Sequence, residues 1–147
     1  RPATARCPGS ARGLVTMRYM LDTNICIYAI KNRPASVIAA LRAHESAGIG
    51  ISAVSVGELY FGVKKSCSAK NLLALQHFLQ PLEIADFDPA AAETYGEIRQ
   101  QLEAAGTPIG PLDTQIAAHA VSLGVTLVSN NVREFQRVAG LRLENWA

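Results

Sequence analysis

Four polar residues stand where apolar segments of this sequence end or are interrupted. They are Asp22, Glu58, Asp113 and Asn131. Ligands of parallel α/β sheets bind just beyond the carboxyl ends of the strands, and Asp22 directly follows an apolar run at 19–21. Three carboxylates and an amide that converged there would form an oxygen-rich site suited to Mg²⁺ or Mn²⁺. Such a site suggests metal-dependent phosphodiester chemistry.

Each of these residues also has a structural explanation. Asp22 could form an Asx turn, Asp113 could complement a helix dipole, and Asn131 could occupy a left-handed turn. Glu58 is harder to explain because residues 59–61 beside it are apolar, and a buried carboxylate without a partner is costly. Together the four residues favour a functional site over four separate structural roles.

The elements that must position these residues follow from the hydrophobic pattern. Short apolar runs predict strands at 18–21, 49–52, 82–87, 125–129 and 141–144. Helical spacing and capping residues predict helices at 24–31, 34–47, 52–65, 68–80, 88–106, 112–123 and 132–138. Alternating strands and helices predict an α/β fold, a three-layer α/β/α domain with a central parallel sheet of four to five strands.

The first sixteen residues differ from the rest of the chain. They contain three arginines, no acidic residue and no strand or helix period, and Met17 reads as a natural start. We expect residues 1–16 to be a cloning remnant or a leader outside the fold, and residues 17–147 to form one domain. No apolar run approaches the ~20 residues of a membrane-spanning helix, so we expect no membrane segment.

Charge and cysteine content restrict the partners and the compartment. Without the three arginines of the first segment, the 14 basic residues of the chain fall to 11, against 12 acidic residues. Nucleic-acid binding must then depend on local clusters such as Lys31/Arg33, Lys64/Lys65 or Arg133/Arg137, which could equally be ordinary solvated surface. Cys26 and Cys67 lack metal-ligand spacing and favour a reducing, cytoplasmic location.

Histidines contribute no recognisable metal motif. His44, His77 and His119 lie far apart without ligand spacing. His119 could approach the site from the helix that follows Asp113, but a core or surface role is favoured.

Four segments, in order along the chain, resemble the motifs of PIN-domain ribonucleases. They are Met20-Leu21-Asp22-Thr23-Asn24, Ser52-Ala53-Val54-Ser55-Val56-Gly57-Glu58-Leu59, Gly110-Pro111-Leu112-Asp113-Thr114-Gln115-Ile116-Ala117 and Val128-Ser129-Asn130-Asn131-Val132-Arg133-Glu134-Phe135. The resemblance extends over residues 17–147 and is strongest to the VapC toxins of bacterial type II toxin–antitoxin modules. Any one motif alone would be weak, but the four together are specific.

The resemblance implies a Mg²⁺- or Mn²⁺-dependent endoribonuclease. Asp22, Glu58 and Asp113 would be its catalytic acids and metal ligands, with Glu58 acting directly or through water. The fourth acidic position of the family falls at Asn131, and this amide weakens the expectation of a second firmly held metal.

Three further residues are secondary candidates for the site. The hydroxyls of Thr23 and Ser129 could orient ligands or a scissile phosphate, or could serve only in capping and turn hydrogen bonds. Glu134 could supply the missing carboxylate, or could be a surface residue of a short helix.

The resemblance also implies a substrate and partners. We expect a toxin that cleaves structured RNA, with the anticodon loop of a tRNA as the leading target, because bases there are already unstacked. A cognate antitoxin would fold over the toxin and place an Arg or Lys among the carboxylates, and the toxin would form a homodimer. Two other interpretations stay open: a catalytically weak PIN-fold module that binds RNA or protein, and another metal-dependent nuclease or phosphatase on a similar scaffold.

Overall fold

The computed structural model describes residues 15–147 of the chain. Most of the segment predicted to lie outside the fold, residues 1–16, falls outside this range, as does Cys7. The last two residues of that segment contact the domain. Val15 packs against the hydrophobic core, and the backbone N–H and hydroxyl of Thr16 donate to a Glu83 carboxylate oxygen at 3.0 and 2.8 Å. Contacts with the domain therefore begin before Met17.

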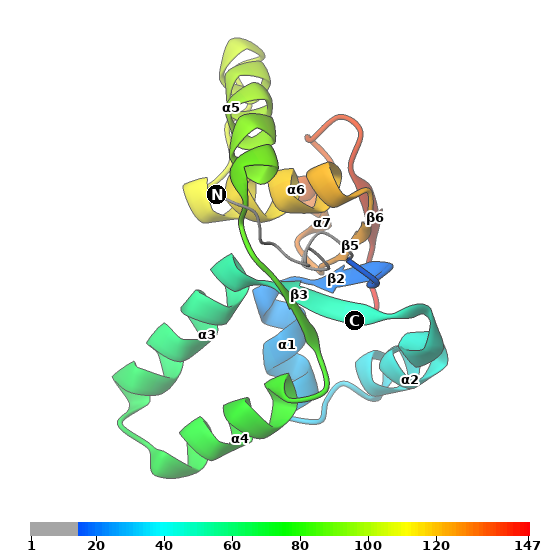
Figure 1. Cartoon of the computed structure of the whole chain (residues 1–147), viewed down its shortest axis with the longest axis vertical. Coiled ribbons are helices and arrows are strands. Elements are labelled where there is room, and N and C mark those ends of the chain that lie inside the picture. The colour runs from blue at the N-terminus through cyan, green and yellow to red at the C-terminus, as the bar shows by residue number, and fades with distance from the viewer. Residues whose placement is uncertain (1–14) are drawn as a thin grey trace, which may run out of the picture.

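A five-stranded sheet forms the centre of the domain, and all of its neighbouring strands are parallel (Figure 1). The strand order is β4-β3-β2-β5-β6, so β2 is central. The strands are β2 Tyr19–Leu21, β3 Ile49–Ser52, β4 Glu83–Ala85, β5 Thr126–Val128 and β6 Arg142–Glu144. Each predicted strand is present, within two residues at either end.

Helices cover both faces of the sheet and complete the three predicted layers (Figure 1). Those on one face are α1 Thr23–Ile30, α2 Ala35–His44 with the 3₁₀ turn η1 Glu45–Ala47, α3 Ala53–Ser66 and α4 Ala69–Leu79. Those on the other face are α5 Pro89–Ala104, α6 Pro111–Leu123 and α7 Val132–Phe135. The α/β fold class is confirmed. Helix α7 is shorter than predicted because the chain turns after it, where the N–H of Val138 donates to the carbonyl of Phe135 at 3.1 Å.

Two hydrophobic clusters, one on each face, hold the layers together. Successive strand residues point to opposite faces, so Met20 and Leu127 join the cluster beneath α5 and α6, whereas Leu21 and Val128 join the cluster with α1 to α4. All four side chains are fully buried. Burial on both faces explains why the strands read as continuous apolar runs rather than alternating patterns.

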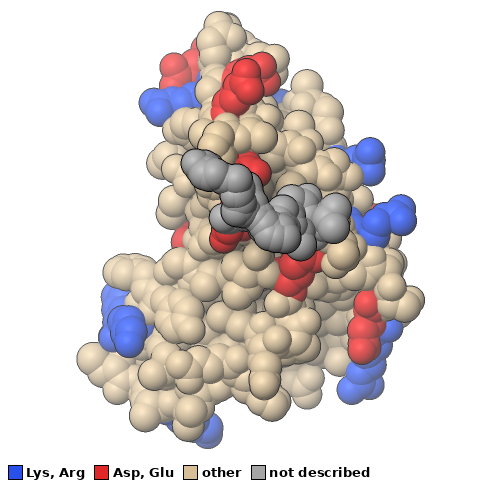
Figure 2. Space-filling model, in the orientation of Figure 1, with Lys and Arg blue, Asp and Glu red and all other residues tan. Residues whose placement is uncertain are grey.

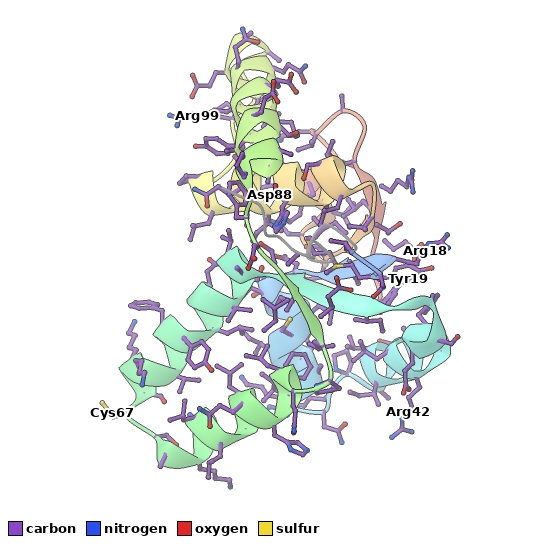
Figure 3. The ribbon with its side chains drawn as sticks, in the orientation of Figure 1. Arg18, Tyr19, Arg42, Cys67, Asp88 and Arg99 are labelled. Atoms are coloured by element: carbon purple, nitrogen blue, oxygen red, sulfur yellow. The ribbon has the colours of Figure 1, made fainter. Side chains whose placement is uncertain are left out.

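Capping residues lie at the helix boundaries where the sequence predicted them. Asp88 (Figure 3) accepts the N–H of Ala91 at 2.9 Å and caps α5. Gly124 terminates α6 in the left-handed conformation, with φ of 69°. No helix within residues 15–147 has the length and hydropathy needed to cross a bilayer.

His119 and the two described cysteines have structural environments. Nδ1 of the buried His119 ring lies 2.8 Å from the Ser52 hydroxyl oxygen, and the ring packs edge-on against Phe87. Desolvation by burial lowers its pKa. The favoured core role is therefore confirmed. Cys26 is buried, and Cys67 is exposed at the tip between α3 and α4 (Figure 3).

The space around Gly50 in β3 and around Gly96 in α5 predicts opposite effects on stability when each glycine is replaced by alanine. A Cβ at Gly50 would lie 2.6 Å from the Glu83 carbonyl oxygen and would overlap the Met17 side chain, whereas one at Gly96 in α5 meets nothing within 4 Å. We expect Gly50→Ala to lower the free energy of unfolding by about 1–3 kcal/mol. Gly96→Ala should raise it by about 0.5–1 kcal/mol. Urea unfolding followed by circular dichroism measures both, and a stable Gly50→Ala protein would contradict the described strand packing.

Candidate active site

Asp22 lies at the junction of the central strand and the first helix. Its backbone N–H donates to the Val128 carbonyl at 2.9 Å and extends the sheet, while its carbonyl accepts the N–H of Cys26 at 3.1 Å in the first turn of α1. The N-cap hydrogen bond from its side chain to α1 is absent. Its carboxylate accepts the Ser129 hydroxyl at 2.8 Å, 107 residues away. This long-range bond ties the end of β2 to the loop after β5.

The buried position of Asp22 disfavours its ionised form. The residue is only 4% exposed. Desolvation raises the pKa of its carboxyl, and the charge of Glu58 raises it further. The hydrogen bonds from Ser129 and from the backbone of Thr23 oppose this shift by stabilising the carboxylate. Nearby, burial first and then the Asp22 charge raise the pKa of the Cys26 thiol, so this cysteine is an inert packing residue.

Glu58 reaches the same edge of the sheet from α3. Its Oε1 accepts the Thr23 hydroxyl at 2.7 Å, which ties α3 to the start of α1. The side chain is half-buried, with exposed Gly57 and Phe61 beside it. The sequence argument from apolar neighbours overestimated its burial because those neighbours point to different sides of the helix.

Asp113 occupies the first turn of α6, and its pKa is raised to about 6. Desolvation is the largest cause, followed by the charges of Asp22, Glu134 and Glu58 and a hydrogen bond with the Glu134 side chain. Glu134 therefore lies near enough to act on Asp113, and its role in the site stays a prediction.

Asn131 follows β5 on a loop that Ser129 holds in place. The Ser129 hydroxyl, which donates to Asp22, also accepts the backbone N–H of Asn131 at 2.9 Å. Nδ2 of the Asn131 amide lies 3.5 Å from Oδ2 of Asp113. Its φ is −88°, so a left-handed turn does not explain this asparagine.

The donor chemistry of the site fits a hard divalent cation, although a ready-made metal cage is not present. Within residues 15–147, no three His, Cys, Asp or Glu side chains lie close enough together to hold one ion as they stand. Asp22 and Glu58 lie near enough to Asp113 for their charges to raise its pKa. Mg²⁺ or Mn²⁺ would stabilise a group of negatively charged oxygen donors that lie near one another. Their role as metal ligands stays a prediction.

Sequence reasoning missed one pair of residues at the site. Asn130 Nδ2 donates to the Tyr28 hydroxyl at 2.8 Å and so ties the loop after β5 to α1. The partners are 102 residues apart, and no local pattern links them. The only signal was the place of Asn130 between Ser129 and Asn131.

The chain resembles known proteins over most of its length. The PIN domain family matches residues 19–141. The chain is 45% identical over 132 residues to the tRNA(fMet)-specific endonuclease VapC of Shigella flexneri, covering 89% of this chain and 99% of that protein. It is 46% identical to ribonuclease VapC2 of Haemophilus influenzae, covering 88% of this chain and 98% of that protein.

Solved structures show the same similarity. VapBC2 from Rickettsia felis bound to a fragment of promoter DNA matches with a TM-score of 0.82 and 44% identity, covering 88% of this chain and 98% of that chain. DNA-bound VapBC from Salmonella typhimurium matches with a TM-score of 0.83 and 41% identity, covering 89% and 99%.

The raised pKa of Asp113 predicts how stability responds to pH in the absence of divalent metal. The folded protein holds the proton up to a pKa of about 6, whereas an unfolded Asp releases it near about 3.9. Between these values the folded state binds more protons, so the contribution of Asp113 to stability falls as pH rises. Asp113→Asn removes this charge and should raise the melting temperature at pH 8, with the gain vanishing near pH 4. Thermal unfolding in EDTA at both pH values tests this, and a variant less stable than the wild type at pH 8 would contradict it.

Proposed function

We propose that this chain, which belongs to the VapC ribonucleases of the PIN-domain family, is a divalent-metal-dependent endoribonuclease toxin that cleaves an initiator tRNA. That the protein is a nuclease follows from its family. The metal, the individual catalytic residues and the RNA target are the proposal.

One observation carries the catalytic part of the proposal. Asp22 is buried, held by Ser129 and surrounded by the charges of Glu58, Asp113 and, through Asp113, Glu134. None of these four carboxylates forms an ion pair with a Lys or Arg of residues 15–147. A protein keeps such a costly arrangement where a positively charged ligand or a reaction uses it.

Asp22 and Asp113 would hold Mg²⁺ or Mn²⁺, and Glu58 would contribute directly or through water. When bound, the cation would stabilise negative charge that develops on the phosphate and would lower the pKa of a water molecule. Ser129 keeps one Asp22 oxygen in a fixed direction, and Thr23 does the same for Glu58. Asn131 Nδ2 is a neutral donor beside Asp113 that can bind a phosphate oxygen without adding negative charge.

The RNA target is proposed from the relatives. Two proteins with 45% and 42% identity over nearly their whole lengths, from Shigella flexneri and Salmonella typhimurium, are tRNA(fMet)-specific endonucleases. We propose the same tRNA here, cut in its anticodon loop, where unpaired bases let the strand reach a small active site. The balanced charge of residues 17–147 requires few, local contacts, so binding should be sensitive to salt.

The partner is proposed on the same basis. Solved relatives are VapBC complexes of toxin and antitoxin. A VapB-type antitoxin would inhibit this chain by placing an Arg or Lys side chain among the carboxylates, where it would pair with Asp22 or Asp113 and exclude the metal. Homodimerisation stays a prediction from the family resemblance.

Cleavage of initiator tRNA in the presence of Mg²⁺ tests the proposed activity. We expect the wild-type protein to cut this tRNA once, in the anticodon loop. Asp22→Asn should lower the rate by at least ~100-fold, because it removes a ligand worth several kcal/mol of transition-state stabilisation. Glu97→Gln is the matched control, since it makes the same chemical change at an exposed position of α5 and should retain full activity. Equal rates for Asp22→Asn and the wild type, with both proteins folded, would refute the assignment of Asp22.

Asn131 should adjust metal dependence rather than decide it. An amide binds a divalent cation more weakly than a carboxylate does. Asn131→Asp should therefore lower the Mg²⁺ or Mn²⁺ concentration needed for half-maximal cleavage and keep activity. Asn131→Ala should reduce the rate less than Asp22→Ala does. Metal titration of cleavage in the three variants is the measurement, and an Asn131→Ala protein as inactive as Asp22→Ala would make Asn131 an essential group.

A further inference from the structure

A pocket with two cationic side chains lies at the C-terminal end of α1. Its volume is about 380 Å³, and it is lined by Ile27, Tyr28, Lys31, Arg33 and Pro34. None of these residues is one of the carboxylates described above, but Tyr28 contacts their loop through Asn130, and Lys31 also lines a neighbouring pocket with Glu58.

The turn that carries the two cations is held by backbone hydrogen bonds. The N–H groups of residues 31, 32 and 33 each donate to a carbonyl of α1 at 3.0 Å. Asn32 adopts the left-handed conformation, with φ of 60°, which lets the chain reverse at this point. Lys31 and Arg33 are therefore presented from a fixed backbone rather than from a loose loop.

Both cations are available to a ligand. Lys31 and Arg33 are exposed, and neither side chain forms an ion pair or hydrogen bond within residues 15–147. By contrast, the guanidinium of Arg99 on α5 (Figure 3) already donates hydrogen bonds to Glu103 at 2.9 Å and to the Tyr95 hydroxyl at 3.0 Å. The free guanidinium of Arg33 has the planar set of donors that binds phosphate oxygens.

Tyr28 connects this pocket to the loop of the carboxylate site. Its ring lines the pocket while its hydroxyl accepts Asn130 Nδ2 at 2.8 Å. Asn130 lies between Ser129, which binds Asp22, and Asn131, which approaches Asp113. Along α1, Lys31 is eight residues beyond Thr23, or about 12 Å at 1.5 Å per residue. A nucleic-acid strand at the carboxylates can reach the pocket within a few nucleotides.

We infer that this pocket is a phosphate-binding subsite for the RNA substrate. Lys31 and Arg33 bind the phosphodiester backbone a few nucleotides from the bond that is cut, and Tyr28 and Pro34 offer apolar surface to the adjoining ribose or base. The inference rests on the proposed ribonuclease function. The two cations of this pocket attract the RNA backbone, whereas the negative charges of the carboxylate site repel it.

The charges on one face of the molecule do not form a broad basic surface. Lys and Arg side chains occur there in separate small groups (Figure 2). This favours RNA binding through local contacts, and Lys31 and Arg33 are two exposed cations on one hydrogen-bonded turn.

Salt-dependent RNA binding tests the inference. The probe is a fluorescently labelled RNA stem–loop with the sequence of the initiator anticodon arm, and all proteins carry Asp22→Asn so that the RNA stays intact. Adding Lys31→Ala together with Arg33→Ala should raise the Kd roughly tenfold at low salt. It should also reduce the slope of log Kd against log salt by about 1.4, since each lost phosphate contact on a single strand contributes about 0.7.

Matched variants separate a specific site from general charge. Arg42→Ala removes one exposed cation near the C-terminal end of α2 (Figure 3) and should leave the Kd and the slope unchanged. Arg33→Lys keeps the charge and should keep the slope. Because Lys31 and Arg33 are exposed and make no side-chain hydrogen bond or ion pair within residues 15–147, the double variant should melt at the wild-type temperature. An unchanged slope in the double variant, or an equal effect of Arg42→Ala, would overturn the inference.

A protein ligand would give a different pattern. If the double variant lost affinity for a purified antitoxin but bound RNA with unchanged Kd and slope, the pocket would belong to the protein partner and the inference would be wrong. Failure of the catalytic proposal is distinguishable from both results. In that case the protein without Asp22→Asn would leave the stem–loop intact in Mg²⁺, while the salt slope would still depend on Lys31 and Arg33.

Discussion

The site depends on a carboxylate held where the central strand becomes a helix. The main chain of Asp22 belongs to both elements, since its N–H continues the sheet to Val128 and its carbonyl receives the first hydrogen bond of α1 from Cys26. These backbone hydrogen bonds fix the position of its Cα, and its side chain is buried. Ser129 compensates for the burial by donating its hydroxyl, and the same oxygen accepts the N–H of Asn131. One serine thus stabilises the buried charge and sets the course of the loop after β5.

Crowding of negative charge follows from that arrangement and costs the folded protein stability. Burial and neighbouring charge raise the pKa of Asp22, and they raise the pKa of Asp113 to about 6. The charge of Glu134 and its side-chain hydrogen bond contribute to the raised pKa of Asp113. A divalent ion and a cationic side chain of an inhibitor would both relieve the same repulsion. Activity and inhibition can therefore be alternative ways of neutralising one cluster.

The sequence predicted the parts of this structure that depend on local patterns. Burial on both faces produced the apolar runs that marked the central strands β2 and β5, and Asp88 and Gly124 marked helix ends. Asp22 and Asp113 were recognisable because each interrupts an apolar segment at the boundary of an element. The half-buried state of Glu58 and the pairing of Tyr28 with Asn130 were not predictable in this way. Both depend on how segments far apart in the sequence meet, which hydrophobic periodicity does not encode.

Helix α1 joins the two kinds of charge that an RNA-cleaving site needs. It begins beside Asp22, where Thr23 binds Glu58, it contacts the loop after β5 through Tyr28, and Lys31 caps its C-terminal end. The ends are separated by about 12 Å, which is close to the screening length of about 10 Å at 0.1 M salt. The proposed reaction centre and the proposed cationic subsite would thus lie at the two ends of one short helix, a spacing that a single RNA strand can bridge.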